Sequence, residues 1–373
     1  MCAGRPSVEI IRNFTATGRI AAVDDYGAGN INDTFIVRFD DATDRQCLIL
    51  QRINKTVFPD PIATVKNSAL VAAHITNKAT TGPALVPTLV RTYTGETSFV
   101  DPAGQVWRAW TLVSGKSWKT AVSVAQAFSM GNALAKFQRA LLDFRDTDLA
   151  NTLPGFHDFG LRVSELKRAL NSSGSIRRRR ADSAIQQTIE YVKLMRPVWS
   201  EIENQASAHP RIIHGDSKAE NILYDEVNGS CFLVDLDTVM VGNILVDFGD
   251  LVRSGAATVP EDEVAAHGEG IDLRHLFAIC DGYLSVARDF LFPDEIELLP
   301  VAGAAMGLAL AVRFLTDWLL GDIYFKINYA AHNLTRACGQ LRVVESILDK
   351  RTIFYRHVDD VLSHPPTSLP PEG

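Results

Sequence analysis

The sequence predicts an α+β protein in two parts, a small β-rich N-terminal lobe and a larger α-helical lobe. Short apolar runs separated by glycine and proline turns fill the N-terminal region, which is typical of strands. From Ser117 the apolar spacing becomes helical, apart from one β-rich island at 211–241. The predicted organisation is residues 1–112 for the β-rich lobe, 113–363 for the helical lobe and 364–373 for a proline-rich flexible tail.

The N-terminal lobe is predicted to contain several extended segments and one helix. A glycine turn, Tyr26-Gly-Ala-Gly-Asn-Ile-Asn32, separates the first two strands. Two prolines precede a segment at 62–78 in which apolar residues recur at helical spacing. The extended segments are Arg19–Val23, Thr34–Phe39, Cys47–Ile53, Leu85–Tyr93 and Val106–Val113.

The helical lobe is predicted to be built from long helices. The most apolar stretch, Leu298–Val312, ends at Arg313 and Asp317, and it is too short to span the ~30 Å of a bilayer core, so it is interpreted as a buried core helix. The predicted helices cover residues 121–143, 160–170, 182–204, 261–290, 295–320 and 336–362.

Composition and charge narrow the class of protein. Hydrophobic residues make up 46% of the 373 residues and charged residues 22%, which excludes a wholly disordered or fibrous chain. The net charge of −7 argues against a nucleic-acid partner, because such surfaces carry a basic excess. The basic run Arg177–Arg180 is therefore interpreted as a solvated loop or helix start. The sequence makes no prediction of the oligomeric state.

The cysteines and the N-terminus favour a reducing compartment. The five cysteines are scattered and form no CxxC pair, so neither a disulfide scaffold nor a zinc site is expected. The first residues, MCAGRPSVEIIRNF, lack the apolar run of a secretory signal. We expect a cytoplasmic protein with no membrane partner.

The β-rich island carries the strongest chemical signal, the sequence His214-Gly-Asp-Ser-Lys-Ala-Glu-Asn221 followed by an apolar strand that ends in Asp235. Phosphoryl transfer from ATP needs a carboxylate that accepts the proton of the attacking hydroxyl, and an amide and a second carboxylate that hold magnesium. In this order, Asp216 is the predicted base, and Asn221 and Asp235 are the predicted metal ligands. A hairpin with a polar turn is the simpler alternative.

Residues beside this pattern receive secondary roles. Lys218 lies two residues after the base, where its ammonium is expected to reach the γ-phosphate, and His214 is expected to brace the loop. Asp247-Phe-Gly249 spells a known metal-binding tripeptide but lies too far along the chain for one hairpin return, so Asp247 is expected to brace a loop or cap a helix at 248–254. If the strand stays extended, Asp237 points to the same side as Asp235 and supports the metal or the substrate.

These motifs resemble the aminoglycoside phosphotransferase/choline kinase family. The resemblance implies a protein-kinase-like two-lobe fold, with ATP and Mg²⁺ as cofactors and a small-molecule alcohol as acceptor. It also implies that Gly27, Gly29 and Asn30 of the glycine turn cover the phosphates, and that the adenine lies near Trp110 and Val113.

One position departs from the family pattern. The third strand of this fold normally carries a lysine that holds the phosphates and pairs with a glutamate on the following helix. Gln51 occupies that place, and the segment 62–78 contains no acidic residue. The paired loss is self-consistent, because a buried glutamate without its lysine would be costly. It leaves a non-catalytic nucleotide-binding protein as an alternative function.

Further segments are similar to the N-acetylhexosamine 1-kinases of this family, among them Ile49-Leu-Gln-Arg-Ile-Asn54 and Asp235-Leu-Asp-Thr-Val-Met240. These enzymes are active with glutamine at the lysine position. The resemblance implies phosphorylation of the anomeric hydroxyl of an N-acetylhexosamine, with Thr238, Arg313 and Tyr324 in contact with the sugar. Kinases of aminoglycosides, choline, homoserine or a plain hexose remain alternatives.

Arg313 is also open to two interpretations from the residues alone. A charged residue inside an apolar helix is expensive unless it faces a pocket or an acid. Arg313 therefore either lines the acceptor pocket or forms a salt bridge with Asp317, its i+4 neighbour.

Overall fold

A computed structural model describes residues 5–15, 18–27, 31–40, 47–78, 84–121, 123–144 and 149–364. The chain divides into two compact units, and neither is a single stretch of sequence. The first unit contains Met1–Ser114, Asp143–Pro154 and Phe232–Met240, and the second contains Gly115–Leu142, Gly155–Cys231 and Val241–Gly373. The predicted α+β class is confirmed.

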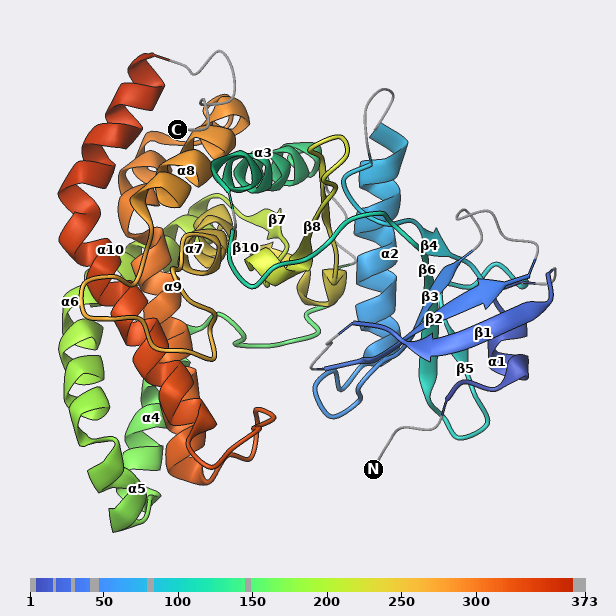
Figure 1. Ribbon diagram of the computed structural model, residues 1–373, viewed down its shortest axis with the longest axis horizontal. Helices are drawn as coiled ribbons and strands as arrows, with labels where there is room; N and C mark the ends of the chain where they lie inside the picture. Colours follow the sequence, from blue (N-terminus) through green and yellow to red (C-terminus); the bar gives the residue numbers. More distant parts are fainter. Residues whose placement is uncertain are drawn as a thin grey trace. The chain divides into compact units, whose positions relative to one another are not determined.

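The first unit is built on an antiparallel sheet with the strand order β1-β2-β3-β6-β4, in which β5 also pairs with β6 (Figure 1). Cross-strand register places Thr34 opposite Gln51 and Gln51 opposite Arg108, so one row of side chains runs across β2, β3 and β6. The strands are β1 (Ile20–Asp25), β2 (Asp33–Phe39), β3 (Leu48–Arg52), β4 (Leu89–Val90), β5 (Phe99–Val100) and β6 (Val106–Thr111).

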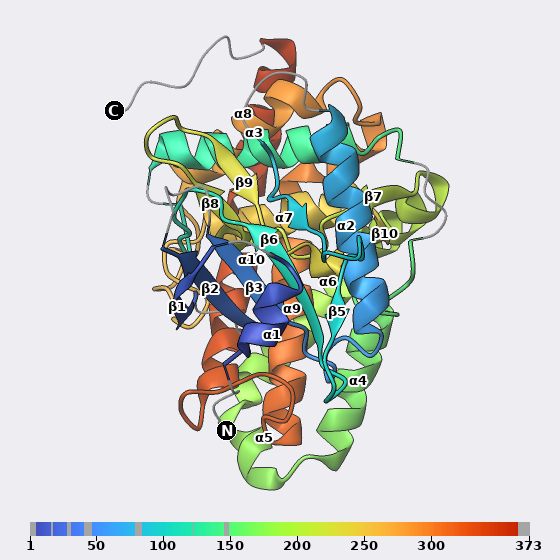
Figure 2. The same cartoon turned by 90° about the vertical axis from the view of Figure 1, so that its right-hand side faces the viewer.

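The two faces of this sheet differ in chemistry. Helix α1 (Val8–Arg12) packs on one face, which Figure 2 shows, in a core of Ile10, Ile11, Phe14, Phe35, Val37, Leu50, Trp107 and Ala109. Because side chains alternate along a strand, Arg108 on β6 points away from the α1 face. Its Nη1 instead lies 3.4 Å from the hydroxyl of Ser68 on α2 (Pro61–Lys78). The α2 face is therefore partly polar.

The second unit is a helical array around α9, a 28-residue helix (Figure 1). Glycines allow close helix crossings, because a Cβ on Gly249 of α7 would lie 2.4 Å from the backbone oxygen of Ala302 on α9. The helices are α3 (Val124–Ala140), α4 (Phe159–Ser172), α5 (Ser175–Arg180), α6 (Asp182–Ala208), α7 (Ile244–Gly255), α8 (Leu273–Ala287), α9 (Pro293–Leu320) and α10 (His332–Ser363).

Helix α9 is the apolar core helix that the sequence predicts. Within the described part of the chain, it is the one helix long and apolar enough to cross a membrane, and 78% of its most apolar window is buried inside the protein. Packing against α4, α6, α7 and α10 accounts for that burial.

The β-rich island folds as four short strands and two single-turn helices. β7 (Arg211–Ile213) pairs with β10 (Met240–Gly242), and β8 (Ile222–Tyr224) pairs with β9 (Cys231–Leu233). A 3₁₀ turn, η2 (Ala219–Asn221), precedes β8, and a second, η3 (Leu236–Thr238), follows β9.

Several predicted elements need correction. The helix predicted at 261–290 begins only at Leu273, because Gly268 adopts a left-handed φ of 78° and Asp272 caps the helix by accepting a bond from Arg274 N at 2.8 Å. Helix α7 begins at Ile244, so Asp247 lies in its first turn and not before it. The extended segment Leu85–Tyr93 forms a strand over only two residues. Helix α1 was not predicted, whereas the basic run Arg177–Arg180 lies in α5, in agreement with its interpretation as a helix start. Residues 365–373 of the predicted tail lie outside the described residues.

Candidate active site

The buried carboxylate of Asp247 holds the loop between β7 and β8, residues 214–221. Asp247 Oδ2 accepts the backbone N–H of His214 and Oδ1 accepts that of Gly215, both at 2.8 Å. Ser217 Oγ donates to the backbone oxygen of Asp247 at 2.8 Å. The predicted bracing role of Asp247 is thus confirmed, and α7 fixes the start of the loop.

Two further contacts fix the rest of this loop. Ser254 Oγ on α7 accepts the backbone N–H of Ala219 at 3.0 Å. His157 Nε2 lies 2.9 Å from the backbone oxygen of Gly215, and since a carbonyl only accepts, this nitrogen carries the proton. Gly215 has φ 82°, a left-handed conformation that a glycine adopts without strain.

The side chain of Asp216, in the same loop, is 25% exposed. Asn221 Nδ2 donates to Asp216 Oδ2 at 2.8 Å and to its backbone oxygen at 2.7 Å. Lys218 Nζ lies 3.3 Å from the same carboxylate oxygen. Among the described residues, no hydrogen bond is made to Asp216 Oδ1, so this oxygen is left for another donor. The structure therefore brings together three of the predicted site residues.

Opposite charge keeps Asp216 ionised. Burial alone would raise the pKa of Asp216, but the Lys218 ammonium, together with His214 and Arg253, lowers it below the ordinary value. In turn the carboxylate of Asp216 raises the pKa of Lys218. The pair is thus a carboxylate and an ammonium at neutral pH.

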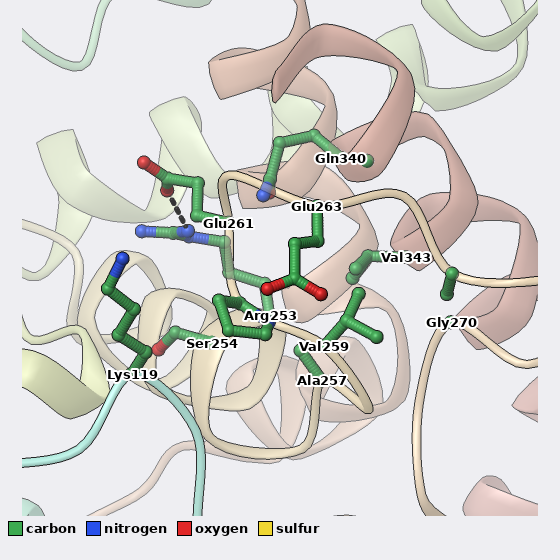
Figure 3. Close-up of a pocket in the computed structure, with 13 residues that line it drawn as sticks. Lys119, Arg253, Ser254, Ala257, Val259, Glu261, Glu263, Gly270, Gln340 and Val343 are labelled. Carbon is green, nitrogen blue, oxygen red and sulfur yellow. Dashed lines mark hydrogen bonds and ion pairs between the residues drawn. The ribbon is translucent and has the colours of Figure 1, made fainter. Parts of the chain in front are cut away.

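Arg253 and Asp250, which are both buried, form an ion-pair network with the partly exposed Glu261. Arg253 on α7 donates to Asp250 at 2.7 Å and to Glu261 at 2.6 Å. A cavity of about 20 Å³ lies beside it, and Figure 3 shows Glu261 and Arg253 joined at its wall. Gln340 Oε1 at this cavity has no hydrogen-bond partner among the described residues. The space suits one water molecule and is too small for a substrate.

Arg313 on α9 faces aromatic rings. Its guanidinium carbon lies 4.9 Å from the ring centre of Phe156, 5.8 Å from that of Tyr324 and 5.4 Å from that of Phe325. Burial lowers the pKa of Arg313, while Tyr324 and Asp216 favour its charged form. Arg313 thus lies within electrostatic range of the predicted base, Asp216.

Asp317 does not pair with Arg313, so the alternative interpretation of Arg313 as a helix-surface salt bridge is wrong. Asp317 Oδ1 accepts the backbone N–H groups of Ile323 and Tyr324 at 2.9 and 2.8 Å. Its Oδ2 accepts that of Phe325 and the amide of Asn333, both at 2.9 Å. One buried carboxylate therefore orders the loop that follows α9 and carries Tyr324, which is 57% exposed.

His157 is a site residue that the sequence analysis missed. Burial, with Arg313 nearby, lowers the pKa of His157 to about 4, against the opposing effect of Asp216. The imidazole is therefore neutral near pH 7. No motif marks it, and only the fold brings residue 157 to the loop at Gly215.

Asp235, the predicted second metal ligand, belongs to the first unit. It has φ 63° and ψ 58°, and with Asp322 it is one of two described non-glycine residues with positive φ. Such a conformation costs on the order of 1–3 kcal/mol and persists where surrounding contacts enforce it. Thr238, at the end of the η3 turn, is 7% exposed, and its predicted contact with substrate stays a prediction.

The chain does not stay extended after Asp235, which corrects the premise for Asp237. The 3₁₀ turn that follows sends the Asp237 side chain into the first unit, where it is 2% exposed. Arg108 Nη1 forms an ion pair with its Oδ1, and Asn32 Nδ2 donates to its Oδ2 at 2.6 Å. Asp237 is thus enclosed by protein groups, and its predicted contact with substrate stays a prediction.

The nucleotide-side predictions fall on the first unit. Gln51 Nε2 donates to Thr34 Oγ1 at 3.1 Å, and Gln51 Oε1 accepts from Arg108 Nε at 2.9 Å. Gly27 has φ 72°, whereas Gly29 and Asn30 lie outside the described residues. Trp110 is buried on β6 and Val113 is half-buried beyond its end.

Arg108, in the first unit, is a second residue that the sequence analysis missed. A charged residue among buried neighbours in Val106-Trp-Arg-Ala-Trp-Thr111 is a signal in the sequence, because an apolar strand accepts an arginine only with a partner. Its partner, Asp237, lies 129 residues further along the chain, and no pattern in the sequence indicates that the two residues pair.

Comparison with known proteins identifies the family. Residues 24–278, more than half of the chain, match the phosphotransferase enzyme family. The match includes the 214–221 loop as well as Asp235 and Asp247.

Solved structures share the fold over nearly the whole chain. An aminoglycoside phosphotransferase from Alicyclobacillus acidocaldarius has a TM-score of 0.61 at 14% identity, over 98% of each chain. The amicoumacin kinase hAmiN, in complex with AMP-PNP and Ca²⁺, has a TM-score of 0.55 at 12% identity, over 99% of this chain and 96% of that one. A choline kinase from Cryptosporidium parvum has a TM-score of 0.52 at 11% identity, over 92% of each chain.

Proposed function

Because the chain belongs to the phosphotransferase enzyme family, we propose that it transfers the γ-phosphoryl group of ATP to the anomeric hydroxyl of an N-acetylhexosamine or a related hexose. The observation that carries the acceptor proposal is the Arg313 guanidinium, which three aromatic rings hold in the unit that also carries Asp216. A guanidinium fork donates to neighbouring hydroxyls of a sugar ring in fixed geometry.

Asp216 is proposed as the base. The acceptor oxygen forms a bond to the γ-phosphorus, the bond from that phosphorus to the β–γ bridging oxygen breaks, and ADP leaves with the electron pair. The hydroxyl proton passes to Asp216 Oδ1, the oxygen that no described residue occupies. A low pKa keeps Asp216 ionised and ready, and the late proton transfer of a loose transition state does not need a strong base.

Asn221 and Asp235 are proposed to hold Mg²⁺. Their amide and carboxylate oxygens are the hard donors that this ion prefers, so the donor chemistry fits. When bound, Mg²⁺ supplies positive charge to the β- and γ-phosphates. Asn221 is oriented for the task, because its Nδ2 is fixed on Asp216 and its oxygen is therefore directed elsewhere.

The two guanidinium groups near His157 favour a neutral acceptor over a cationic one. Arg313 and Arg162 both act on His157, whose pKa they lower, so two guanidinium groups lie within electrostatic range of it. An aminoglycoside or choline would bring further positive charge to this region. A neutral sugar meets hydrogen-bond donors and aromatic faces instead, which supports the sugar over those alternatives.

The test is a panel of acceptors in an ADP-release assay with ATP and Mg²⁺. We expect kcat/KM for N-acetylglucosamine or N-acetylgalactosamine to exceed that for choline and kanamycin. Arg313→Ala should lower kcat/KM for the sugar by an amount equivalent to about 2–4 kcal/mol of transition-state stabilisation, since bound hydroxyls lose their partner. KM for ATP should change little. The exposed Arg180→Ala is the matched control and should behave as wild type. Turnover of choline or kanamycin alone would refute the sugar proposal.

A further inference from the structure

A buried polar network fills the part of the first unit where the strand lysine is missing. Gln51 lies between Thr34 and Arg108 in the row across β2, β3 and β6, and it bonds to both. The Arg108 side chain is 0% exposed, so it is a buried cation on the strand next to the glutamine. Its guanidinium carbon also lies 5.3 Å from the ring centre of Trp110.

The network converges on the η3 turn. Arg108 pairs with Asp237, while Ser68 Oγ on α2 donates to the backbone oxygen of Leu236 at 2.9 Å. Asn32, the last residue of the glycine turn, donates to Asp237 and accepts the backbone N–H of Asn54 at 2.9 Å. The turn is thus tied to the sheet, to α2 and to the end of the glycine turn.

These ties act on the residue just before the turn. Asp235 holds a strained left-handed backbone conformation, and the residues after it are fixed by Arg108, Ser68 and Asn32. Without those contacts the strain at Asp235 would relax, because such conformations persist only where surrounding structure enforces them.

The network is not built for stability alone. Arg108 Nη2 is buried and has no hydrogen-bond partner among the described residues. A buried guanidinium with an unpaired donor is expensive, and an apolar pair at these positions would be cheaper. Such a costly arrangement is expected where it fixes a functional geometry.

We propose that Arg108 is a positioning residue that replaces the missing strand lysine by a different route. It does not reach the nucleotide, because it is fully buried. Instead, its pair with Asp237 sets the backbone at Asp235 and thereby the placement of that carboxylate toward a divalent metal. The proposal rests on the proposed function only in taking Asp235 as a metal ligand.

The test measures nucleotide binding by calorimetry, with AMP-PNP in the presence of Mg²⁺ and in EDTA. Because no acceptor is used, the result does not depend on the sugar proposal. In Arg108→Met, we expect the affinity for AMP-PNP with Mg²⁺ to fall at least tenfold, and the affinity in EDTA to stay within twofold of wild type. Arg108→Lys should restore part of the Mg²⁺-dependent affinity, and added Mg²⁺ should compensate in both variants.

Two variants keep the test decisive. Arg52→Met removes an arginine on the neighbouring strand that pairs with the partly exposed Asp33, and it should leave the Mg²⁺ dependence unchanged. Asp237→Asn serves as the second variant if Arg108→Met does not fold, because asparagine has the shape of aspartate. It should show the same selective loss of Mg²⁺-dependent affinity for AMP-PNP. A folded Arg108→Met or Asp237→Asn protein that binds AMP-PNP with Mg²⁺ as tightly as wild type would overturn the proposal. So would an equal loss with Mg²⁺ and in EDTA. If wild type binds Mg²⁺-dependently yet phosphorylates no sugar, only the acceptor proposal fails.

Discussion

The loop after α9 is expected to depend on one carboxylate, and replacing Asp317 by asparagine tests this. Asp317 accepts four hydrogen bonds, two on each oxygen, and it is 3% exposed. Asparagine keeps one accepting oxygen and turns an NH₂ group toward two donors. Two charge-assisted bonds at about 1.5–3 kcal/mol each are lost, which makes release of the loop about 3–6 kcal/mol easier.

Limited proteolysis and kinetics report the two consequences. Asp317→Asn should be cleaved faster within residues 321–331, because that segment opens more often. Since Tyr324 then loses its fixed position, kcat/KM for the acceptor should fall by ~10–100-fold while KM for ATP stays near wild type. Asp349→Asn, at an exposed position on α10, is the matched control. Wild-type cleavage and wild-type kinetics in Asp317→Asn would refute the reasoning.

Three further predictions concern the loop and the metal ligands. Asp216→Asn should abolish turnover but leave nucleotide affinity nearly intact, whereas Asp235→Asn should weaken Mg²⁺-dependent nucleotide binding as well; retained turnover in either variant contradicts the assignment. Asp247→Ala leaves two loop N–H groups without an acceptor and should destabilise the protein by about 2–5 kcal/mol in thermal melts; an unchanged melting temperature contradicts the bracing role. For His157, the folded pKa of about 4 lies below the ordinary 6.5, so the unfolded chain binds more protons in this window. The free energy of unfolding should therefore fall by about 3 kcal/mol as pH drops from 6.5 to 4. In His157→Gln the urea midpoint should change less with pH over that range than in wild type, and an equal pH dependence of the two midpoints would refute the prediction.

The sequence predicted those parts of the site that lie close together in the chain. Asp216, Lys218 and Asn221 are separated by a few residues, and their short loop brings them together as the spacing implies. The bracing role of Asp247 was predicted because this residue lies too far after Asp216 for one hairpin return. Local spacing is informative because a loop between two short strands leaves few ways to arrange its side chains.

The parts that were not predicted depend on long-range contacts. Arg108 and Asp237 come from distant segments, and the premise that the chain stays extended hid their pairing. Asp317 was considered only as a helical neighbour of Arg313, although its partners are backbone groups of the next loop. The segments 143–154 and 232–240 join the first unit through tertiary contacts, which a linear division of the chain does not capture.

Phosphorus NMR of the reaction products tests the central claim most directly. Wild-type protein, ATP and Mg²⁺ are incubated with N-acetylglucosamine, N-acetylgalactosamine or their 1-O-methyl glycosides, with Asp216→Asn as the inactive control. The account predicts an anomeric phosphate from at least one free sugar, none from either methyl glycoside, and none with Asp216→Asn. A phosphate ester formed on a 1-O-methyl glycoside, or an anomeric phosphate formed by Asp216→Asn at the wild-type rate, would contradict it.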